Sequence, residues 1–178
     1  MEKWNCKKHS AVHQPERLSF AIRTFSFVLL RLDNYQFGID MRLGELEEIR
    51  DLDLFKTMAE KNFSDMMNAA YLQTFPSQVE LIREGDPADF FYVVIEGCVE
   101  LFAKSNDRET TMAMVRPVGT FILAAVLKDA IYLMSARTCD RSKIVMIPSQ
   151  DVRSAVNKDQ EFAGSIINEL AGCYRAVV

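Results

Sequence analysis

Six short segments with the residue types of β-strands follow one another in this chain, and turn-forming residues such as Gly85-Asp86-Pro87 and Pro117-Val118-Gly119 separate them. The segments are residues 78–82, 90–95, 98–103, 110–115, 133–139 and 143–147. Strands this short and this closely spaced favour antiparallel pairing over alternating βαβ units. The sequence therefore predicts a mainly β fold with flanking helices, in the form of an antiparallel β-roll of the double-stranded β-helix or jelly-roll type.

Helical patterns lie on both sides of the predicted strands. Residues 43–50 have helical character, and residues 53–67 continue as a cluster of short helices. After the strands, Ser149 is placed to cap a helix over 150–156, and Asp159 to cap a longer helix that runs to residue 178. We therefore expect three regions: an N-terminal extension at 1–45, a β-roll at 46–158 and a C-terminal helix at 159–178.

The C-terminal helix carries a stripe of apolar and small residues with heptad spacing. Its members follow one another at intervals of 3, 4, 3 and 4 residues: Ala163, Ile166, Leu170, Cys173 and Val177. Such a seam is typical of a helix that pairs with a partner helix. Two heptads do not distinguish a dimer helix from a helix that packs on its own domain, so the spacing alone leaves both interpretations open.

The N-terminal extension contains one amphipathic pattern. Its apolar residues fall on one stripe of a helix: Leu18, Ile22, Phe25, Leu29 and Leu32. This helix would dock on the domain or on a partner chain, with a membrane-surface helix as the alternative. The sequence lacks the apolar run of a secretory signal or of a transmembrane helix. Its four cysteines are dispersed without a CxxC pair, which is typical of a reducing compartment. We expect a cytoplasmic protein with no membrane partner.

Charge and histidine content exclude several classes of function. With 21 basic and 25 acidic residues the net charge is −4, so the chain lacks the overall positive charge that is typical of nucleic-acid-binding proteins. The last histidine is His13, so the predicted strands offer no imidazole for a cupin-type metal site or for a general base. Cys6, His9 and His13 only loosely resemble a metal-ligand set. We therefore expect no enzymatic activity and no metal site.

Residues 81–101, LIREGDPADFFYVVIEGCVEL, resemble the effector domain of the Crp/Fnr family of bacterial transcription regulators, which are relatives of other cyclic nucleotide-binding domains. Gly85 and Gly97 have the family's spacing of twelve residues, and Gly119 matches the glycine that opens the family's phosphate-binding cassette. Glycine suits such structural turns because it adopts positive φ without strain. The resemblance covers residues 46–178, and it implies a β-roll and a homodimer formed through the C-terminal helix.

The cassette departs from the family pattern at the two positions that hold a cyclic nucleotide. Family members that bind cyclic AMP hold its ribose with a glutamate and its phosphate with an arginine, and the corresponding residues here are Ala124 and Met134. A phosphate removed from water needs charged donors, so we expect cyclic AMP not to bind. The resemblance instead implies a pocket that takes an unknown ligand or is filled by its own side chains. Its residues are Phe121, Ile122, Ala124, Ala125, Met134, Ser135 and Arg137.

Haem is the alternative cofactor that the resemblance suggests, because some relatives sense gases with haem and an apolar cassette is compatible with it. The candidate axial ligands are Cys98, Cys139, Met134, Tyr132, His9 and His13. An iron–sulfur cluster would need four thiolates gathered together, and only Cys6 lies near the N-terminus, where the family supplies three.

The function implied is that of a sensor domain, which couples an unknown signal to the geometry of a dimer and through it to DNA binding. Family members carry a winged helix-turn-helix domain after the dimerisation helix. We therefore expect this chain to be a fragment of a regulator that contacts DNA only through a domain not present here. A haem-based gas or redox sensor of the same superfamily is one alternative. A stand-alone ligand-binding or adaptor domain without DNA binding is another.

Overall fold

The computed structural model describes residues 43–105, 108–128 and 131–177. The amphipathic helix predicted within the N-terminal extension lies outside these ranges. None of the helices in the described ranges has both the length and the hydrophobicity that a bilayer crossing demands.

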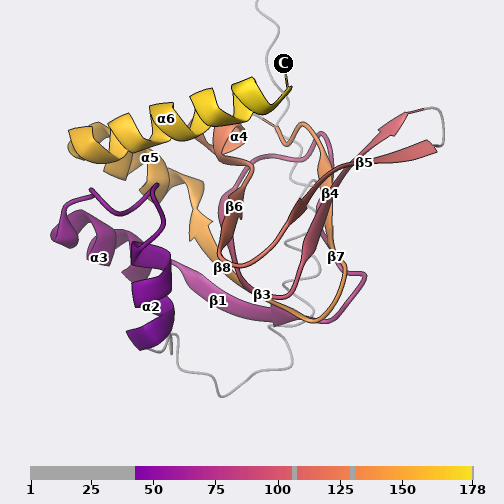
Figure 1. The fold of residues 1–178 in the computed structure, drawn as a ribbon, viewed down its shortest axis with the longest axis horizontal. Helices are drawn as coiled ribbons and strands as arrows, with labels where there is room; N and C mark the ends of the chain where they lie inside the picture. The colour runs from indigo at the N-terminus through magenta and orange to yellow at the C-terminus, as the bar shows by residue number, and fades with distance from the viewer. Residues whose placement is uncertain (1–42, 106–107, 129–130, 178) are drawn as a thin grey trace, which may run out of the picture. The chain divides into compact units, whose positions relative to one another are not determined.

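Two four-stranded antiparallel sheets form the centre of the domain (Figure 1). In the first sheet the strands lie in the order β1 (Tyr71–Phe75), β8 (Ser142–Pro148), β3 (Phe90–Glu96) and β6 (Gly119–Phe121). In the second the order is β2 (Glu80–Ile82), β7 (Ser135–Thr138), β4 (Val99–Ser105) and β5 (Arg108–Val115). All strand pairs are antiparallel, and the predicted β-roll is confirmed.

Two of the eight strands were missed by the sequence reasoning. β1 has only exposed and half-buried residues and includes Gln73 and Thr74, so it lacks the alternation of apolar and polar residues that marks a half-buried strand. β6 has three residues and starts with Gly119, directly after the breaker at Pro117. Both strands lie at the edges of the first sheet, where pairing with one neighbour defines a strand that its own composition does not indicate.

Within the described ranges, five helices accompany the sheets. They are α2 (Leu43–Arg50), α3 (Glu60–Asn68), α4 (Leu123–Leu127), α5 (Ser149–Lys158) and α6 (Gln160–Val177). α2 has the predicted bounds, whereas the segment before α3 consists of turns. The Arg50 guanidinium stabilises these turns, since it donates hydrogen bonds to the carbonyl oxygens of Phe55 and Met58, both at 2.5 Å.

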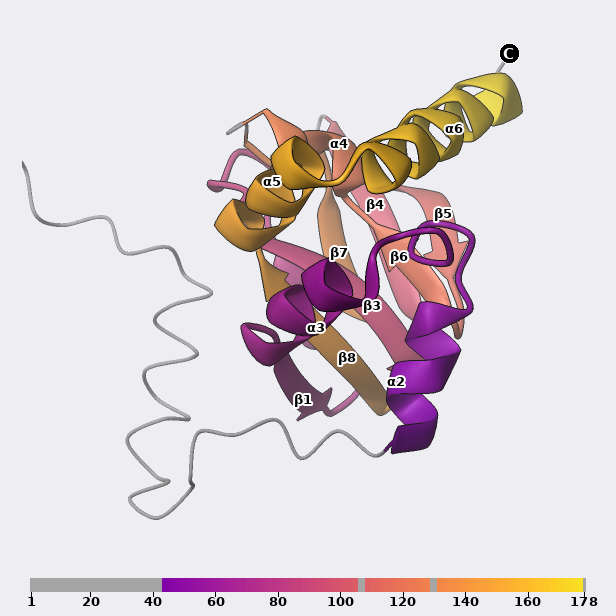
Figure 2. The same cartoon turned by 90° about the vertical axis from the view of Figure 1, so that its left-hand side faces the viewer.

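One hydrophobic core lies between the first sheet and the helices. Along β3 the side chains alternate: Phe91, Val93 and Ile95 belong to the helix-side core, together with Phe55 and Phe162. Figures 1 and 2 show α2, α3 and α5 on this side of the first sheet. The rings of Phe55 and Phe162 stack with centroids 5.8 Å apart. This contact joins the turn before α3 to the first turn of α6.

The two predicted N-caps have different outcomes. Asp159 caps α6 as expected, because its Oδ1 accepts a hydrogen bond from the Phe162 N–H at 3.1 Å. The prediction for Ser149 is wrong: α5 has no side-chain cap hydrogen bond, and the Ser149 hydroxyl donates instead to the Ala88 carbonyl oxygen at 2.5 Å. Ser149 is buried, at 2% exposure, so its hydroxyl satisfies a backbone oxygen of the β2–β3 connection.

Asp159 also joins α6 to α3. Its Oδ2 accepts hydrogen bonds from the Ala59 N–H at 2.8 Å and from the Asn62 side-chain amide at 2.9 Å. Ala59 is the residue before the first turn of α3. One carboxylate therefore satisfies backbone donors at the N-termini of both helices.

We expect Asp159→Ala to lower the free energy of unfolding by about 1–3 kcal/mol, because it leaves the backbone N–H groups of Ala59 and Phe162 without their side-chain acceptor. The hydrogen bond from Asn62, with those from the backbone N–H groups, holds the pKa of this carboxyl below its ordinary value of 3.8. A lowered native pKa stabilises the fold above the unfolded-state pKa, and this contribution is lost as the pH falls through the native pKa. Urea unfolding at neutral pH and at about pH 3 should therefore show a smaller difference between the two proteins in acid. Asp65→Ala, at an exposed position of α3, is the control, and an equal loss in both variants would contradict this role.

Candidate functional site

The predicted pocket residues fall in two places, on the β6–α4 connection and on β7. Phe121 ends β6, and α4 begins two residues later. Between them Ile122 has φ 69°, a left-handed conformation that is rare for a β-branched residue. This sharp turn exposes Ala124 and buries Ala125, at 5% exposure. Ala124, the residue predicted to correspond to the ribose-binding glutamate of the family pattern, therefore presents only a methyl group at the surface.

The interior of the roll is filled by aromatic side chains where these elements meet. Tyr92 lies opposite Phe121 in the β3–β6 register, and their rings stack with centroids 5.0 Å apart. The Tyr132 hydroxyl donates to the Phe90 carbonyl oxygen at 3.1 Å and accepts from the Phe90 N–H at 3.2 Å. Burial, followed by the neighbouring Tyr132, raises the pKa of Tyr92 well above its ordinary value of 10.0, so this phenol is neutral at physiological pH.

Arg137 is held by two carboxylates. Its Nε donates to Glu100 Oε2 and its Nη1 to Glu109 Oε2, both at 2.8 Å. The guanidinium carbon lies 4.4 Å from the centroid of the Phe102 ring. The Thr111 hydroxyl, followed by Arg137, holds the pKa of Glu100 below its ordinary value. An incoming phosphate would have to displace two ion pairs to reach this arginine.

The β7 residues of the predicted pocket do not all face the roll interior. Side chains alternate along β7, so Arg137 lies on the opposite face from the buried residues Ala136 and Thr138. The Ser135 hydroxyl accepts a hydrogen bond from the Glu84 N–H at 3.0 Å, and Met134 is half-buried just before the strand. The structure therefore separates Arg137 from the aromatic stack that contains Phe121.

The candidate haem ligands within the described residues lie at different ends of β7. Cys139 follows the strand with Cys98 beside it, whereas Tyr132 and Met134 precede it. The Tyr132 hydroxyl is engaged with the backbone of Phe90. His9 and His13 lie outside the described residues. Within the described residues, the candidate ligands are therefore not gathered at one site.

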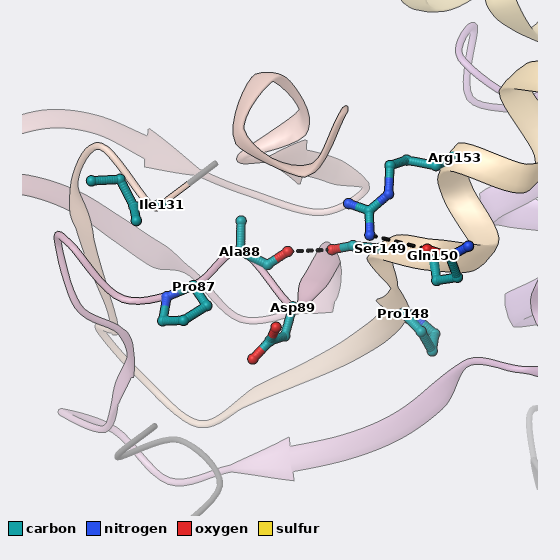
Figure 3. Close-up of a pocket in the computed structure, with 8 residues that line it drawn as sticks. All are labelled: Pro87, Ala88, Asp89, Ile131, Pro148, Ser149, Gln150 and Arg153. Carbon is teal, nitrogen blue, oxygen red and sulfur yellow. Dashed lines mark hydrogen bonds between the residues drawn. The ribbon is translucent and has the colours of Figure 1, made fainter. Parts of the chain in front are cut away.

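A cleft that the sequence reasoning missed lies beside the N-terminus of α5 (Figure 3). It has a volume of about 380 Å³ and is lined by Pro87, Ala88, Asp89, Ile131, Pro148, Ser149, Gln150 and Arg153. Burial raises the pKa of Asp89, while the nearby Arg153 lowers it. The lining residues come from three separate segments, so only the fold brings them together.

Arg153 connects this cleft to α4. Its Nη1 donates to the Val126 carbonyl oxygen in the last turn of α4 at 2.7 Å, and its Nη2 donates to Gln150 Oε1 at 3.3 Å. A cation near the end of a helix is favourable because the carbonyl groups there lack intrahelical donors. Any displacement of α4 must therefore move or break a contact with α5.

The comparisons with known proteins agree on the fold. Residues 72–159 match the family model described as "Cyclic nucleotide-binding domain". A search of the curated proteins found no match.

Three solved structures illustrate the structural similarity. The sensor domain of the transcriptional regulator DNR from Pseudomonas aeruginosa has a TM-score of 0.67 at 18% identity, over 72% of this chain and 87% of that one. The catabolite activator protein of Thermus thermophilus has a TM-score of 0.63 at 20% identity, over 70% of this chain and 59% of that one. The regulatory domain of Toxoplasma gondii PKA, solved with cAMP, has a TM-score of 0.60 at 20% identity, over 65% and 46%. The chain thus spans less than two thirds of the latter two proteins.

We expect Phe121→Ala to lower the free energy of unfolding by about 3–5 kcal/mol, because it leaves a cavity beside Tyr92 in the roll interior. Phe75→Ala, at a half-buried position of the edge strand β1, is the control and should cost less. Denaturant unfolding of both variants measures the difference. Equal losses would show that the aromatic stack does not fill the roll.

Proposed function

We propose that the chain, whose residues 72–159 match the family model described as "Cyclic nucleotide-binding domain", is the sensor domain of a Crp/Fnr-type transcription regulator that responds to a signal other than cyclic AMP. It acts by binding and conformational change rather than by catalysis, in the cytoplasm. DNA would be bound by a winged-helix domain of the kind that Crp/Fnr regulators carry after the dimerisation helix.

The state of Arg137 is the observation that carries this proposal. In the cassette pattern of the cyclic AMP-binding relatives an arginine holds the phosphate, and here that position is Met134. Arg137 is the next arginine along the chain, and Glu100 and Glu109 already neutralise it. Freeing it would leave two carboxylates beside the incoming anion, so the Coulomb energy opposes phosphate binding. The effector is therefore expected to lack a phosphate group.

The route from the cassette to the C-terminal helix follows two polar links. Arg153 ties the end of α4 to α5, and α5 leads directly into α6 at Asp159. Asp159 in turn fixes the start of α6 to α3. An effector that shifts α4 would bias the position of α6 through these contacts. The proposed response is a change in the relative populations of two α6 arrangements.

The dimer contact would lie on the face of α6 that the domain leaves exposed. Ile166 is only 3% exposed and packs in the core with Phe162, so its side chain is not available for a contact with a partner chain. Ile167 is 66% exposed, and Leu170 is half-buried. We therefore place the seam at Ile167 and Leu170. Ala163 is half-buried, and the structure does not describe the side chains of Cys173 and Val177.

Titration calorimetry with cyclic AMP is expected to give no binding heat up to millimolar nucleotide. The double variant Ala124→Glu, Met134→Arg restores both family side chains and should bind more tightly than the natural sequence. Micromolar binding of cyclic AMP to the unmodified chain would refute the proposal that the effector is not cyclic AMP. A double variant that binds no better would show that the cassette backbone also departs from the family.

Light scattering tests the position of the seam. Ile167→Asp is expected to convert a dimer into a monomer, because it places a charge in an apolar contact. Asn168→Asp, at the next exposed position of α6, should leave the mass unchanged. A dimer that survives Ile167→Asp at micromolar concentration would place the interface elsewhere. Circular dichroism of both variants shows whether the fold is retained.

A further inference from the structure

Cys98 and Cys139 lie opposite each other at one end of the second sheet. Cys98 precedes β4 and Cys139 follows β7, and the register pairs their neighbours Val99 and Thr138. The Cys139 N–H donates to the Cys98 carbonyl oxygen at 2.8 Å. Both cysteines are free thiols, and the neighbouring Cys98 contributes to the raised pKa of Cys139.

This arrangement fits the geometry of a disulfide. Residues directly opposite each other in an antiparallel pair have Cα atoms about 4.5–5.5 Å apart, which falls within the range of disulfides, about 4.4–6.8 Å. Opposed residues also point to the same face of the sheet. A bond between the two sulfur atoms therefore requires rotation of side chains and little movement of the backbone.

Two adjacent turns hold the backbone of this pair in place. The Cys98 N–H donates to Asp140 Oδ1 at 2.8 Å and to Ser142 Oγ at 3.2 Å. Gly97 has φ +89°, and a Cβ atom there would lie 2.4 Å from Ser142 Oγ. The β3–β4 turn and the β7–β8 turn are therefore packed against each other, which fixes the distance between the two cysteines.

We propose that Cys98 and Cys139 are a redox-sensitive site that a peroxide converts into a reversible intrachain disulfide. One thiolate attacks the peroxide, an S–O bond forms, the O–O bond breaks and hydroxide leaves. The second thiolate then attacks the sulfenic sulfur, the S–S bond forms and the S–O oxygen leaves as water. For hydrogen peroxide, two thiols and one peroxide give one disulfide and two waters, and a dithiol reductant reverses the change.

The two thiols differ in access. Cys98 is 6% exposed and Cys139 is half-buried, so we expect Cys139 to attack the peroxide first. Burial raises the pKa of Cys139, and the neighbouring Cys98, Glu100 and Asp140 add to this. Because the thiolate is the reactive form, we expect oxidation to be slow at neutral pH and to accelerate as the pH rises. The positive charge of Arg137, which pairs with Glu100, offsets part of the negative charge near Cys139.

The disulfide would close a loop that holds the candidate site. The chain between Cys98 and Cys139 contains β4, β5, β6, α4 and β7, and so includes the cassette. Closing a loop of this length restricts the unfolded chain. Oxidation would therefore stabilise the segment that has to move if α4 transmits a signal. The inference goes beyond the proposed function and does not depend on it, because the bond forms or fails to form whatever the effector is.

The test uses the full chain with Cys6→Ser and Cys173→Ser, which leaves only this pair of cysteines. After treatment with hydrogen peroxide, both thiols should be lost without a change in chain mass on a non-reducing gel. Non-reducing trypsin digestion should yield peptides 84–104 and 138–141 linked by a disulfide. The melting temperature should rise by an amount on the order of 10 °C, and dithiothreitol should reverse it.

Two control variants separate this proposal from simple thiol oxidation. Cys98→Ala and Cys139→Ala in the same background should gain oxygen at the remaining sulfur and show no rise in melting temperature. Cys139→Ala alters the half-buried partner, so it remains informative if Cys98→Ala fails to fold. Absence of the linked peptide, bonding only between chains, or a melting temperature that does not rise in the two-cysteine protein would overturn the proposal.

Discussion

Burial of β3 on both of its faces is the constraint on which the rest of the fold depends. From Phe91 to Ile95 its residues are at most 5% exposed, so both sides of this strand need apolar partners. On one side Val93 and its neighbours meet the helices. On the other Tyr92 stacks on Phe121 and places β6 at the edge of the sheet. The helical layer and the cassette connection are thus fixed by opposite faces of one strand.

The same arrangement joins the cassette to the C-terminal helix. α4 lies close to α5, and α5 to α6, and polar contacts with defined direction reinforce both packings. Arg153 binds a carbonyl oxygen at the end of α4, and Asp159 satisfies N–H groups of α3 and α6. A displacement of α4 or α5 would have to lengthen or break these directional contacts. This is the physical reason to regard α5 as the element that would transmit a displacement of α4.

The sequence predicts the elements that carry their own pattern and misses those that depend on partners. The bounds of α2, the antiparallel roll and the cap at Asp159 follow from periodicity, strand length and a carboxylate before an apolar helix. β1 and β6 cannot be predicted from such patterns, because pairing at a sheet edge defines these two strands. The role of Arg137 could not be predicted from one strand, because its partners Glu100 and Glu109 come from two others. The cleft beside Arg153 was missed for the same reason, since its walls come from distant segments.

The contacts that hold this fold together do not involve Ala124 or Met134, the two residues predicted to correspond to the nucleotide-binding side chains of the family pattern. The scaffold depends on buried β3, on Gly97, where Ser142 leaves no room for a Cβ atom, and on the Asp159 contacts. None of these groups lies at Ala124 or Met134. A charged glutamate and a charged arginine would need solvation or a partner at those positions, whereas apolar groups carry no such electrostatic cost when no phosphate is bound. The contacts that hold the roll together are therefore compatible with either kind of side chain at these two positions.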